Sequence, residues 1–268
     1  MENSKNLRQS SDFIQSLERG LQVIQAFSEE TPKLTVSQAA KITGLSRPAV
    51  RRILLTLEAL GFTESANGIY SLTARTLTLG YAYISSQNIW NIAVPIMREF
   101  VEKTGESCSI SVLDGAEVIY VARVPANRIM SISLDVGSRL PAYASSMGQM
   151  LLACLPEEEL HKVLDETPFK KYTENTIADK ESMMEELDKV RERGWAGVDQ
   201  QLEQGLRSIA VPIRRGDGSV IAAINCSAHA GRVSRKTLRE EFLPLLRETS
   251  DRITQAVSIS SGSSLGSL

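Results

Sequence analysis

The sequence predicts an α+β protein with two domains. With 268 residues, the chain is longer than most single hydrophobic cores allow. Its first quarter has the pattern of three helices followed by a short hairpin, whereas hairpins alternate with helices from Glu106 onward. The second part lacks the strand–helix–strand repeat of a parallel sheet and carries no glycine-rich phosphate-binding fingerprint. We therefore expect a small N-terminal domain and a larger domain built on an antiparallel sheet with flanking helices.

The composition is that of an ordinary soluble protein. Hydrophobic residues make up 42% of the chain and charged residues 23%. The formal net charge is -2, and the isoelectric point is about 5.9. A protein coated with nucleic acid along its whole length would be basic, so any contact with nucleic acid must be local.

The cysteines and the start of the chain indicate the compartment. Cys108, Cys154 and Cys226 lie far apart among apolar neighbours, and no pair has CxxC spacing. This arrangement is typical of a reducing compartment and offers no metal site. The polar start lacks the apolar core of a signal peptide, and no uncharged apolar run approaches the roughly 18 residues of a membrane helix. We therefore expect a cytoplasmic protein without a membrane segment, metal or other cofactor.

Helix signals follow one another closely at the start of the chain. Residues 16–29 have apolar side chains at helical spacing, with Ser16 as N-cap. Residues 35–43 predict a short helix that begins with a capping box at Thr35 and ends at Gly44, where glycine accepts a left-handed conformation.

A third helix and a hairpin complete this domain. Ser46 caps the helix, and Pro48 lies in its first turn, where a missing N–H costs nothing. After Gly61, two short strands surround Asn67-Gly68, a strong type I′ hairpin signal. These elements have the order of a winged helix-turn-helix, which is a DNA-binding arrangement. The apolar stripe of the third helix consists of Val50, Ile53, Leu54, Leu57 and Leu60.

Burial of that stripe turns a basic face outward. Arg47, Arg51 and Arg52 lie near the N-terminal end of the third helix, the end that enters the major groove in this motif. Arginine binds either guanine or phosphate, and the sequence does not assign these roles. A solvated basic face is the alternative, and the hairpin tip has no lysine or arginine. The residues expected to contact DNA are Thr35, Ser46, Arg47, Pro48, Ala49, Arg51, Arg52 and Asn67.

The remainder of the chain predicts a mixed domain. Residues 73–104 are helical, and hairpins surround Asp114-Gly115 and residues 216–218. Further predicted helices cover residues 145–155, 156–165, 179–193 and 234–257.

Several blocks of the chain resemble a known family. The first blocks read SLERGLQVIQAF, LTVSQAAKITGLSRPAVRRILLTLEALGF and IYSLTARTLTLGYAY, and later ones read LPAYASSMGQMLLACLP, GWAGVDQQLEQGLRSIAVPI and VIAAINCSAHAGRVS. In this collinear order, from about Leu17 to Val257, they resemble IclR-type transcriptional regulators. The last blocks are most similar to the Pca/Pob branch, whose members regulate protocatechuate, 4-hydroxybenzoate and β-ketoadipate catabolism.

The resemblance implies a winged-helix domain, a dimerising linker helix and a GAF-like effector domain. It also implies operator binding as a dimer or a dimer of dimers, with RNA polymerase as a possible partner. The implied effector pocket lies between the N-terminus of a helix and the central sheet. Some relatives have cysteine at the position of Ser208 and serine at the position of Asn225. The resemblance therefore implies where the ligand binds but not which ligand it is. The pocket positions implied for this chain are Ser146, Met147, Asp199, Ser208, Asn225 and Ser227.

The residues themselves are compatible with a pocket for a small acid. Tyr143 begins a segment that opens a helix, whose free N–H groups form a natural carboxylate cradle, while Ser145 is better suited to capping that helix. Asn225 and Ser227 share one face of an apolar strand, and that face lines a cavity or meets solvent. We therefore add Tyr143 and Ser145 to the expected effector-binding residues.

Charged residues near this region allow two interpretations. Arg139 and Arg207 could pair with a ligand carboxylate, or form structural ion pairs, for instance with Asp135 or Glu203. Asp199 would suit a hydroxyl group on the effector, as hydroxybenzoates carry.

Catalysis is not indicated. The histidines are His161 and His229, and the sequence has no GxSxG elbow, HExxH motif or paired Cys/His metal spacing. Ser208 and His229 could be imagined as nucleophile and base, but nothing in the sequence specifies that geometry. We expect no catalytic residues and a regulator rather than an enzyme, with a small-acid hydrolase as the contrasting class.

The expected organisation follows from these signals. An apolar stripe in residues 77–101 is longer than one domain needs, so Tyr81, Ile84, Ile89 and Trp90 are candidates for a dimer seam, with intrachain packing as the alternative. We expect a dimer that reads a partly palindromic operator and responds to a small aromatic or dicarboxylic acid. The expected segments are a disordered start (1–15), the DNA-binding domain (16–75), a linker helix (76–90), the effector domain (91–258) and a disordered tail (259–268).

Overall fold

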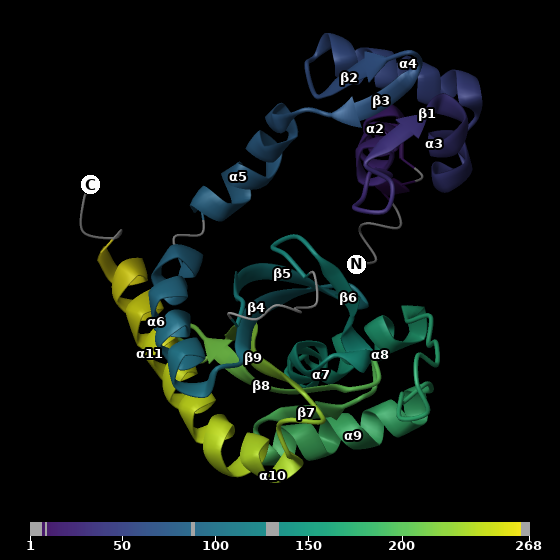
Figure 1. The fold of residues 1–268 in the computed structure, drawn as a ribbon. Helices are drawn as coiled ribbons and strands as arrows, with labels where there is room; N and C mark the ends of the chain where they lie inside the picture. Colours follow the sequence, from purple (N-terminus) through teal and green to yellow (C-terminus); the bar gives the residue numbers. More distant parts are fainter. Residues whose placement is uncertain (1–6, 9, 87–88, 127–133, 264–268) are drawn as a thin grey trace. The chain divides into compact units, whose positions relative to one another are not determined.

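The computed structural model describes residues 7–8, 10–86, 89–126 and 134–263. The chain forms two compact units, Met1–Ser86 and Gln87–Leu268, and each unit has its own hydrophobic core (Figure 1). No helix in the described ranges is long and apolar enough to cross a membrane.

The first unit packs helices around a three-stranded sheet with the strand order β1-β3-β2. Val23, Leu34, Val50, Leu54 and Tyr70 are buried together in its core, which joins α2, the sheet and α4. The elements in chain order are α2 (Gln15–Gln25), β1 (Lys33–Thr35), α3 (Val36–Thr43), α4 (Arg47–Ala59), β2 (Thr63–Ala66), β3 (Ile69–Leu72), η1 (Ala74–Thr76) and α5 (Leu77–Ser86).

Local sequence sets the ends of α3 and α4. The Thr35 hydroxyl accepts a hydrogen bond from the backbone N–H of Gln38, and the Gln38 side-chain oxygen accepts one from the Thr35 N–H at 2.8 Å. Gly44 has a φ of 71°, a conformation that glycine adopts without strain. At the start of α4, the Ser46 hydroxyl accepts a hydrogen bond from the Ala49 N–H. The predicted capping box, glycine turn and serine cap are therefore confirmed.

The hairpin is also confirmed, because Asn67 and Gly68 both have the positive φ of a type I′ turn, at 51° and 77°. The prediction for α2 is less accurate. The helix begins at Gln15, so Ser16 lies within it and is not its cap. It ends at Gln25 because the Thr31 hydroxyl donates to the Ala26 carbonyl and closes a turn there.

The second unit is a six-stranded antiparallel sheet, in the order β6-β5-β4-β9-β8-β7, with helices on both faces. Its elements are α6 (Ile89–Thr104), β4 (Ser107–Asp114), β5 (Glu117–Val124), β6 (Arg139–Pro141), η2 (Ala142–Ala144), α7 (Ser146–Ala153), α8 (Glu157–Glu166), α9 (Lys180–Arg193), β7 (Ala196–Asp199), β8 (Leu206–Arg214), β9 (Val220–His229), α10 (Arg235–Thr237), η3 (Leu238–Phe242) and α11 (Leu243–Ser263).

The two faces of this sheet are covered by different helices. Ile110 and Ile224 belong to the core that α6 and α11 complete, and these two helices lie side by side on that face (Figure 1). Tyr120 and Ala223 point to the opposite face and pack with α7, α8 and α9. The alternation of side chains along the strands therefore separates an apolar face from a face that carries polar groups.

Two expectations, one about the tail and one about the linker, differ from the structure. The tail predicted to be disordered from residue 259 is helical as far as Ser263, since extending a formed helix needs no new nucleation step. Residues 264–268 lie outside the described part, as do residues 1–6 and 9 of the predicted disordered start. Trp90 is 4% exposed and Ile89 packs on the same core, so both contribute to packing within the chain. Tyr81 is 69% exposed on α5, and the Ile84 side chain lies outside the described part.

Candidate functional site

The first candidate surface is the basic face of α4, formed by Arg47, Arg51 and Arg52. All three side chains are exposed, whereas Val50 and Leu54 on the other side of the helix are fully buried. No hydrogen bond or ion pair joins any of these guanidinium groups to another residue that the structure describes. The basic face is therefore directed away from the protein, at a helix N-terminus whose dipole also favours anions.

The other residues predicted to contact DNA have different positions. The hydroxyl groups of Thr35 and Ser46 hold the first turns of α3 and α4 in place. Pro48 and Asn67 are exposed, and Ala49 is partly buried. The observed role of Thr35 and Ser46 is therefore to cap α3 and α4, and any contact of these residues with DNA would be a second role.

The hairpin β2–β3 carries one acidic side chain, Glu64, and no basic one, and it lies beside Glu58 of α4. The Ser65 hydroxyl donates to the carboxylate of Glu58 at 2.6 Å, and the Ser71 hydroxyl donates to that of Glu64 at 3.3 Å. Carboxylates at this position repel phosphate. The positive surface suited to nucleic acid is therefore α4, and the hairpin offers at most neutral polar contacts.

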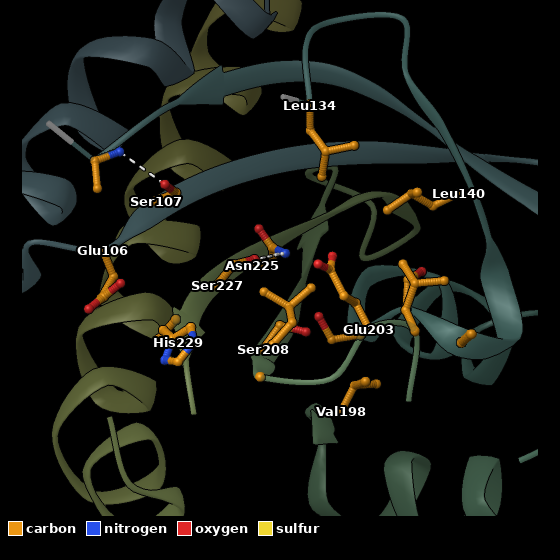
Figure 2. Close-up of a pocket in the computed structure, with 18 of the residues that line it drawn as sticks. Glu106, Ser107, Leu134, Leu140, Val198, Glu203, Ser208, Asn225, Ser227 and His229 are labelled. Carbon is orange, nitrogen blue, oxygen red and sulfur yellow. Dashed lines mark hydrogen bonds between the residues drawn. The ribbon is translucent and has the colours of Figure 1, made fainter. Parts of the chain in front are cut away.

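The second candidate site is a cavity of about 370 Å³ in the second unit (Figure 2). Strands β4, β5, β7, β8 and β9 contribute one wall. The start of α7, residues 202–206 and the side chains of Leu134 and Leu140 contribute the others. A cavity of this size, with mixed polar and apolar walls, suits a small organic molecule.

Two rows of side chains cross the sheet beneath the cavity. In one row the register aligns Ser107, Ser227, Ser208 and Val198, and in the next it aligns Ser109 with Asn225. The Asn225 side chain is held by two hydrogen bonds: its oxygen accepts from the Ser109 N–H at 3.1 Å, and its nitrogen donates to the Ser227 hydroxyl at 3.0 Å. The predicted polar face of β9 therefore points into a cavity.

A β-bulge in strand β5 brings a positive charge to the same wall. Ser111 pairs with Tyr120 and Ile110 pairs with Ala122, so Val121 is an extra residue without a partner on β4. This extra residue places Tyr120 and Arg123 on the same face, and both line the cavity. The Arg123 guanidinium donates to the Ser109 hydroxyl at 3.3 Å.

The N-terminus of α7 closes another side of the cavity. Ser145 caps the helix by accepting a hydrogen bond from the Gly148 N–H at 3.1 Å. Ser146 also lines the cavity, is 1% exposed, and its hydroxyl has no hydrogen-bond partner among the described residues. A buried hydroxyl without a partner is costly, so a polar ligand at this helix terminus would satisfy it.

The loop after β7 forms the rim and is held by many hydrogen bonds. Gln200 has a positive φ of 58°, and its N–H donates to the Leu206 carbonyl at 2.7 Å. Its side-chain oxygen accepts from the Gly205 N–H at 3.0 Å, and the Thr173 hydroxyl donates to its carbonyl at 2.6 Å. This loop directs the carboxyl group of Glu203 into the cavity (Figure 2). The strained conformation at Gln200 is therefore supported from both sides.

Some of the predicted effector-binding residues lie elsewhere. The lining of the cavity includes Ser145, Ser146, Ser208, Asn225 and Ser227. Of the remaining predicted residues, Tyr143 is turned away, with its hydroxyl bonded to the backbone of Lys170, and Met147 is buried between helices and sheet. Asp199 also lies outside the lining, because its carboxylate is bound by Arg207 and Arg235.

The arginines considered from sequence have structural partners. Arg207 pairs with Asp199 and also donates to the carbonyl groups of Ala230 and Val233. Arg139 pairs with Asp114 and Glu117 at the exposed edge of the sheet. Of the two interpretations left open by the sequence, the structure shows ion pairs within the chain for both arginines, with partners other than Asp135 and Glu203.

Other charged residues of the cavity were not predicted. Glu106, directly before β4, is buried and accepts hydrogen bonds from Arg232 at 3.2 and 3.3 Å. Tyr120, Arg123, Glu203 and His229 complete the charged or titratable lining among the described residues. One feature of the sequence could have pointed to Arg123 as a cavity residue: it is a charged residue inside the largely apolar strand β5.

The same residues do not form a catalytic arrangement. The His229 Nδ1 accepts a hydrogen bond from the Gly231 N–H at 3.1 Å. No hydrogen bond links His229 to the Ser208 hydroxyl in the described structure. Among the described residues, no group of three or more His, Cys, Asp or Glu side chains is placed to hold a metal ion.

Comparison with known proteins assigns both units. The family model described as IclR helix-turn-helix domain matches residues 16–66, and the one described as Bacterial transcriptional regulator IclR C-terminal matches residues 81–255. The chain belongs to the IclR family. Its members are transcriptional regulators rather than enzymes.

Three similar proteins refine the relationship. The chain is 45% identical to the Pca regulon regulatory protein of Pseudomonas putida, over 88% of this chain and 81% of the relative. It is 35% identical to the p-hydroxybenzoate hydroxylase transcriptional activator of Acinetobacter baylyi, over 92% and 93%. Among solved structures, an IclR homologue from Microbacterium hydrocarbonoxydans in complex with 4-hydroxybenzoate matches with a TM-score of 0.77 and 26% identity, over 90% of this chain and 98% of the other. The Pca/Pob branch of the IclR family is thereby supported.

Proposed function

We propose that this protein is an effector-responsive transcriptional regulator that controls aromatic acid catabolism by binding a small aromatic or dicarboxylic acid. The observation that carries the proposal is the cavity between α7 and the sheet, with both polar and apolar walls, in a chain that also presents a basic helix-turn-helix face. Similarity to regulators of the Pca regulon and of p-hydroxybenzoate hydroxylase indicates the metabolic area.

The DNA-binding half of the proposal is supported by α4. Arg47, Arg51 and Arg52 are exposed at the end of the helix that enters the major groove in this motif. Because the neighbouring hairpin carries Glu64 and lacks basic residues at its tip, we assign recognition mainly to α4.

The effector-binding half of the proposal rests on five residues. Ser145 and Ser146 present the N-terminus of α7, while Ser208, Asn225 and Ser227 present the sheet. Helix N–H groups and hydroxyl groups are suited to a carboxylate, and the apolar walls are suited to a ring or an aliphatic chain. We leave Tyr143, Met147 and Asp199 out of the proposed contacts because their side chains point elsewhere.

A dimer, or a dimer of dimers, is part of the proposal. The exposed aromatic and aliphatic side chains of α5, including Leu77 and Tyr81, support association through this helix. Two DNA-binding units would then read a partly palindromic operator, with half-sites about one helical turn apart. The acid would change transcription through its different affinities for the two arrangements of these units.

Thermal unfolding with added acids tests the effector. We expect protocatechuate, 4-hydroxybenzoate or β-ketoadipate to raise the melting temperature, because a ligand that binds the folded state stabilises it. A response to glyoxylate alone would favour the alternative of an IclR-type regulator for an unrelated small acid. Flat responses to all four acids would indicate an interaction module with an unused cavity.

A further inference from the structure

The cavity contains carboxylates as well as arginines, which limits the charge that an effector can bring. Among the lining residues that the structure describes, Arg123 and Arg232 carry positive charges, whereas Glu106 and Glu203 carry negative ones. Arg232 donates to both oxygens of the buried Glu106, so these two charges balance each other. An effector with two carboxylates would bring two further negative charges into this lining, where like charges at close range repel. The lining therefore favours an acid with a single carboxylate.

Glu203 differs from the other carboxylate of the lining because it is available to a ligand. Its carboxyl group is directed into the cavity from the loop between β7 and β8 (Figure 2). The residue is exposed, and no hydrogen bond or ion pair joins its carboxyl group to another residue in the part of the chain that the structure describes. A carboxylate only accepts hydrogen bonds, so a ligand group that binds to it must be a donor.

The loop that carries Glu203 is fixed to α7. The Gln149 side chain of α7 donates to the Gln201 side-chain oxygen at 2.9 Å. The Thr176 hydroxyl donates to the Gln201 carbonyl at 2.6 Å, and the Leu206 N–H donates to the Glu203 carbonyl at 3.3 Å. Glu203 and the N-terminus of α7 are therefore held at a set separation on two walls of the cavity. A rigid ligand with a carboxylate at one end and a donor at the other loses less conformational freedom between two fixed points than a flexible chain does.

We infer that Glu203 accepts a hydrogen bond from a hydroxyl group of the effector, while the carboxylate of the effector binds at the N-terminus of α7. This assignment rests on the proposed function and narrows it to hydroxylated aromatic acids with one carboxylate. Ser146 supports the orientation, because its buried hydroxyl lies at that helix end and has no partner among the described residues. Glu203 takes the role expected from sequence for Asp199, whose carboxylate is bound by Arg207 and Arg235 outside the lining.

The first test compares acids with and without a donor opposite the carboxylate. Calorimetry on the full chain would use 4-hydroxybenzoate and protocatechuate, with benzoate and 4-methoxybenzoate as the analogues that cannot donate a hydrogen bond at this position. We expect the tighter of the two hydroxylated acids to bind at least about tenfold more tightly than either analogue, as a hydrogen bond to a charged acceptor allows. Equal affinities for all four acids would overturn the role of Glu203.

The second test removes the charge of Glu203 and keeps its shape. In Glu203→Gln we expect the affinity for the hydroxylated acids to fall about 5- to 30-fold, because the amide oxygen still accepts a hydrogen bond but without the charge. The affinity for benzoate should stay the same or rise, and that for adipate, which has two carboxylates, should rise about 2- to 10-fold, because a like charge is removed. Glu159→Gln is the matched control, since it removes the same charge from an exposed position on α8 outside the lining, and it should leave every affinity unchanged.

The outcomes separate the two levels of the proposal. Unchanged affinity for the hydroxylated acids in Glu203→Gln, or equal losses for these acids and benzoate, would overturn the role of Glu203 and leave the regulator proposal standing. Binding of adipate to the unmodified protein without binding of either hydroxylated acid would do the same and would indicate a dicarboxylic effector. Absence of binding of every acid would overturn the proposed effector itself, and the role of Glu203 with it.

Discussion

Arg51 on the basic face of α4 provides the most direct test of DNA recognition. We expect Arg51→Ala to weaken operator binding by about 1–3 kcal/mol if the side chain reads a base, as measured by gel-shift titration. A contact to phosphate would instead weaken binding to all sequences and lower the salt dependence. Arg239→Ala is the control, because Arg239 is exposed in the other unit beside Glu240. Equal affinities for both variants would exclude Arg51 from the interface.

Asp199 gives the second unit a pH-dependent stability. Burial opposes its charge, but hydrogen bonds and charges from Arg207 and Arg235 hold the pKa of the Asp199 carboxyl below its ordinary value of 3.8. A carboxyl with a lowered folded-state pKa stabilises the fold above its unfolded pKa, and this contribution is lost as the pH falls through the folded value.

We therefore expect Asp199→Asn to be less stable than the unmodified protein at neutral pH, with a difference that shrinks below about pH 4. Urea unfolding between about pH 3 and pH 7 measures this difference. Asp251→Asn serves as a control for a general charge effect, because Asp251 is exposed on α11 and no hydrogen bond or ion pair joins its carboxylate to another described residue. A difference that stays constant with pH would show that the ion pairs of Asp199 do not contribute.

At the scale of elements, helix α7 depends on a close approach at Gly148. A Cβ atom at this position would lie 2.2 Å from the carbonyl oxygen of Ala142, which is backbone and cannot move aside. We expect Gly148→Ala to destabilise the second unit by about 1–3 kcal/mol or more and to weaken acid binding, because the helix N-terminus would shift. Unfolding in urea measures the first effect and calorimetry the second.

Gly20→Ala is the matched control for that substitution. Gly20 lies inside α2, and nothing stands within 4 Å of the position of its added Cβ. Alanine is a better helix former than glycine, so this change should stabilise the first unit by about 0.5–1 kcal/mol. Destabilisation of similar size at both glycines would argue against the close packing of α7.

The elements also show what sequence reasoning could reach. Capping boxes and glycine turns are local, so the ends of α3 and α4 around Thr35 and Gly44 were predictable. The sequence could not predict that the Arg123 side chain faces the cavity, because the bulge changes the alternation of side chains on which strand prediction depends. Asp199 was assigned to the pocket because the family resemblance implied it. Its partner Arg235 lies far along the chain, and no local pattern shows that pairing.

At the scale of the whole molecule, the two units have separate cores. The core of the first unit contains residues from Val23 to Tyr70, and those of the second contain residues from Trp90 to Val257. We expect a fragment covering residues 87–268 to fold and to bind acids with the affinity of the full chain, but not to bind operator DNA. Circular dichroism and calorimetry on the fragment measure both properties. An unfolded fragment would show that the second unit needs the first.

The bulge in β5 has a consequence for how this protein tolerates change. Deleting Val121 would restore an even pleat and leave Tyr120 and Arg123 two residues apart, so both side chains would still point toward the cavity. The strand would lose the Val121 side chain from the apolar core beneath α6 and α11. Loss of this one residue should therefore weaken the core and leave the polar wall of the cavity in place.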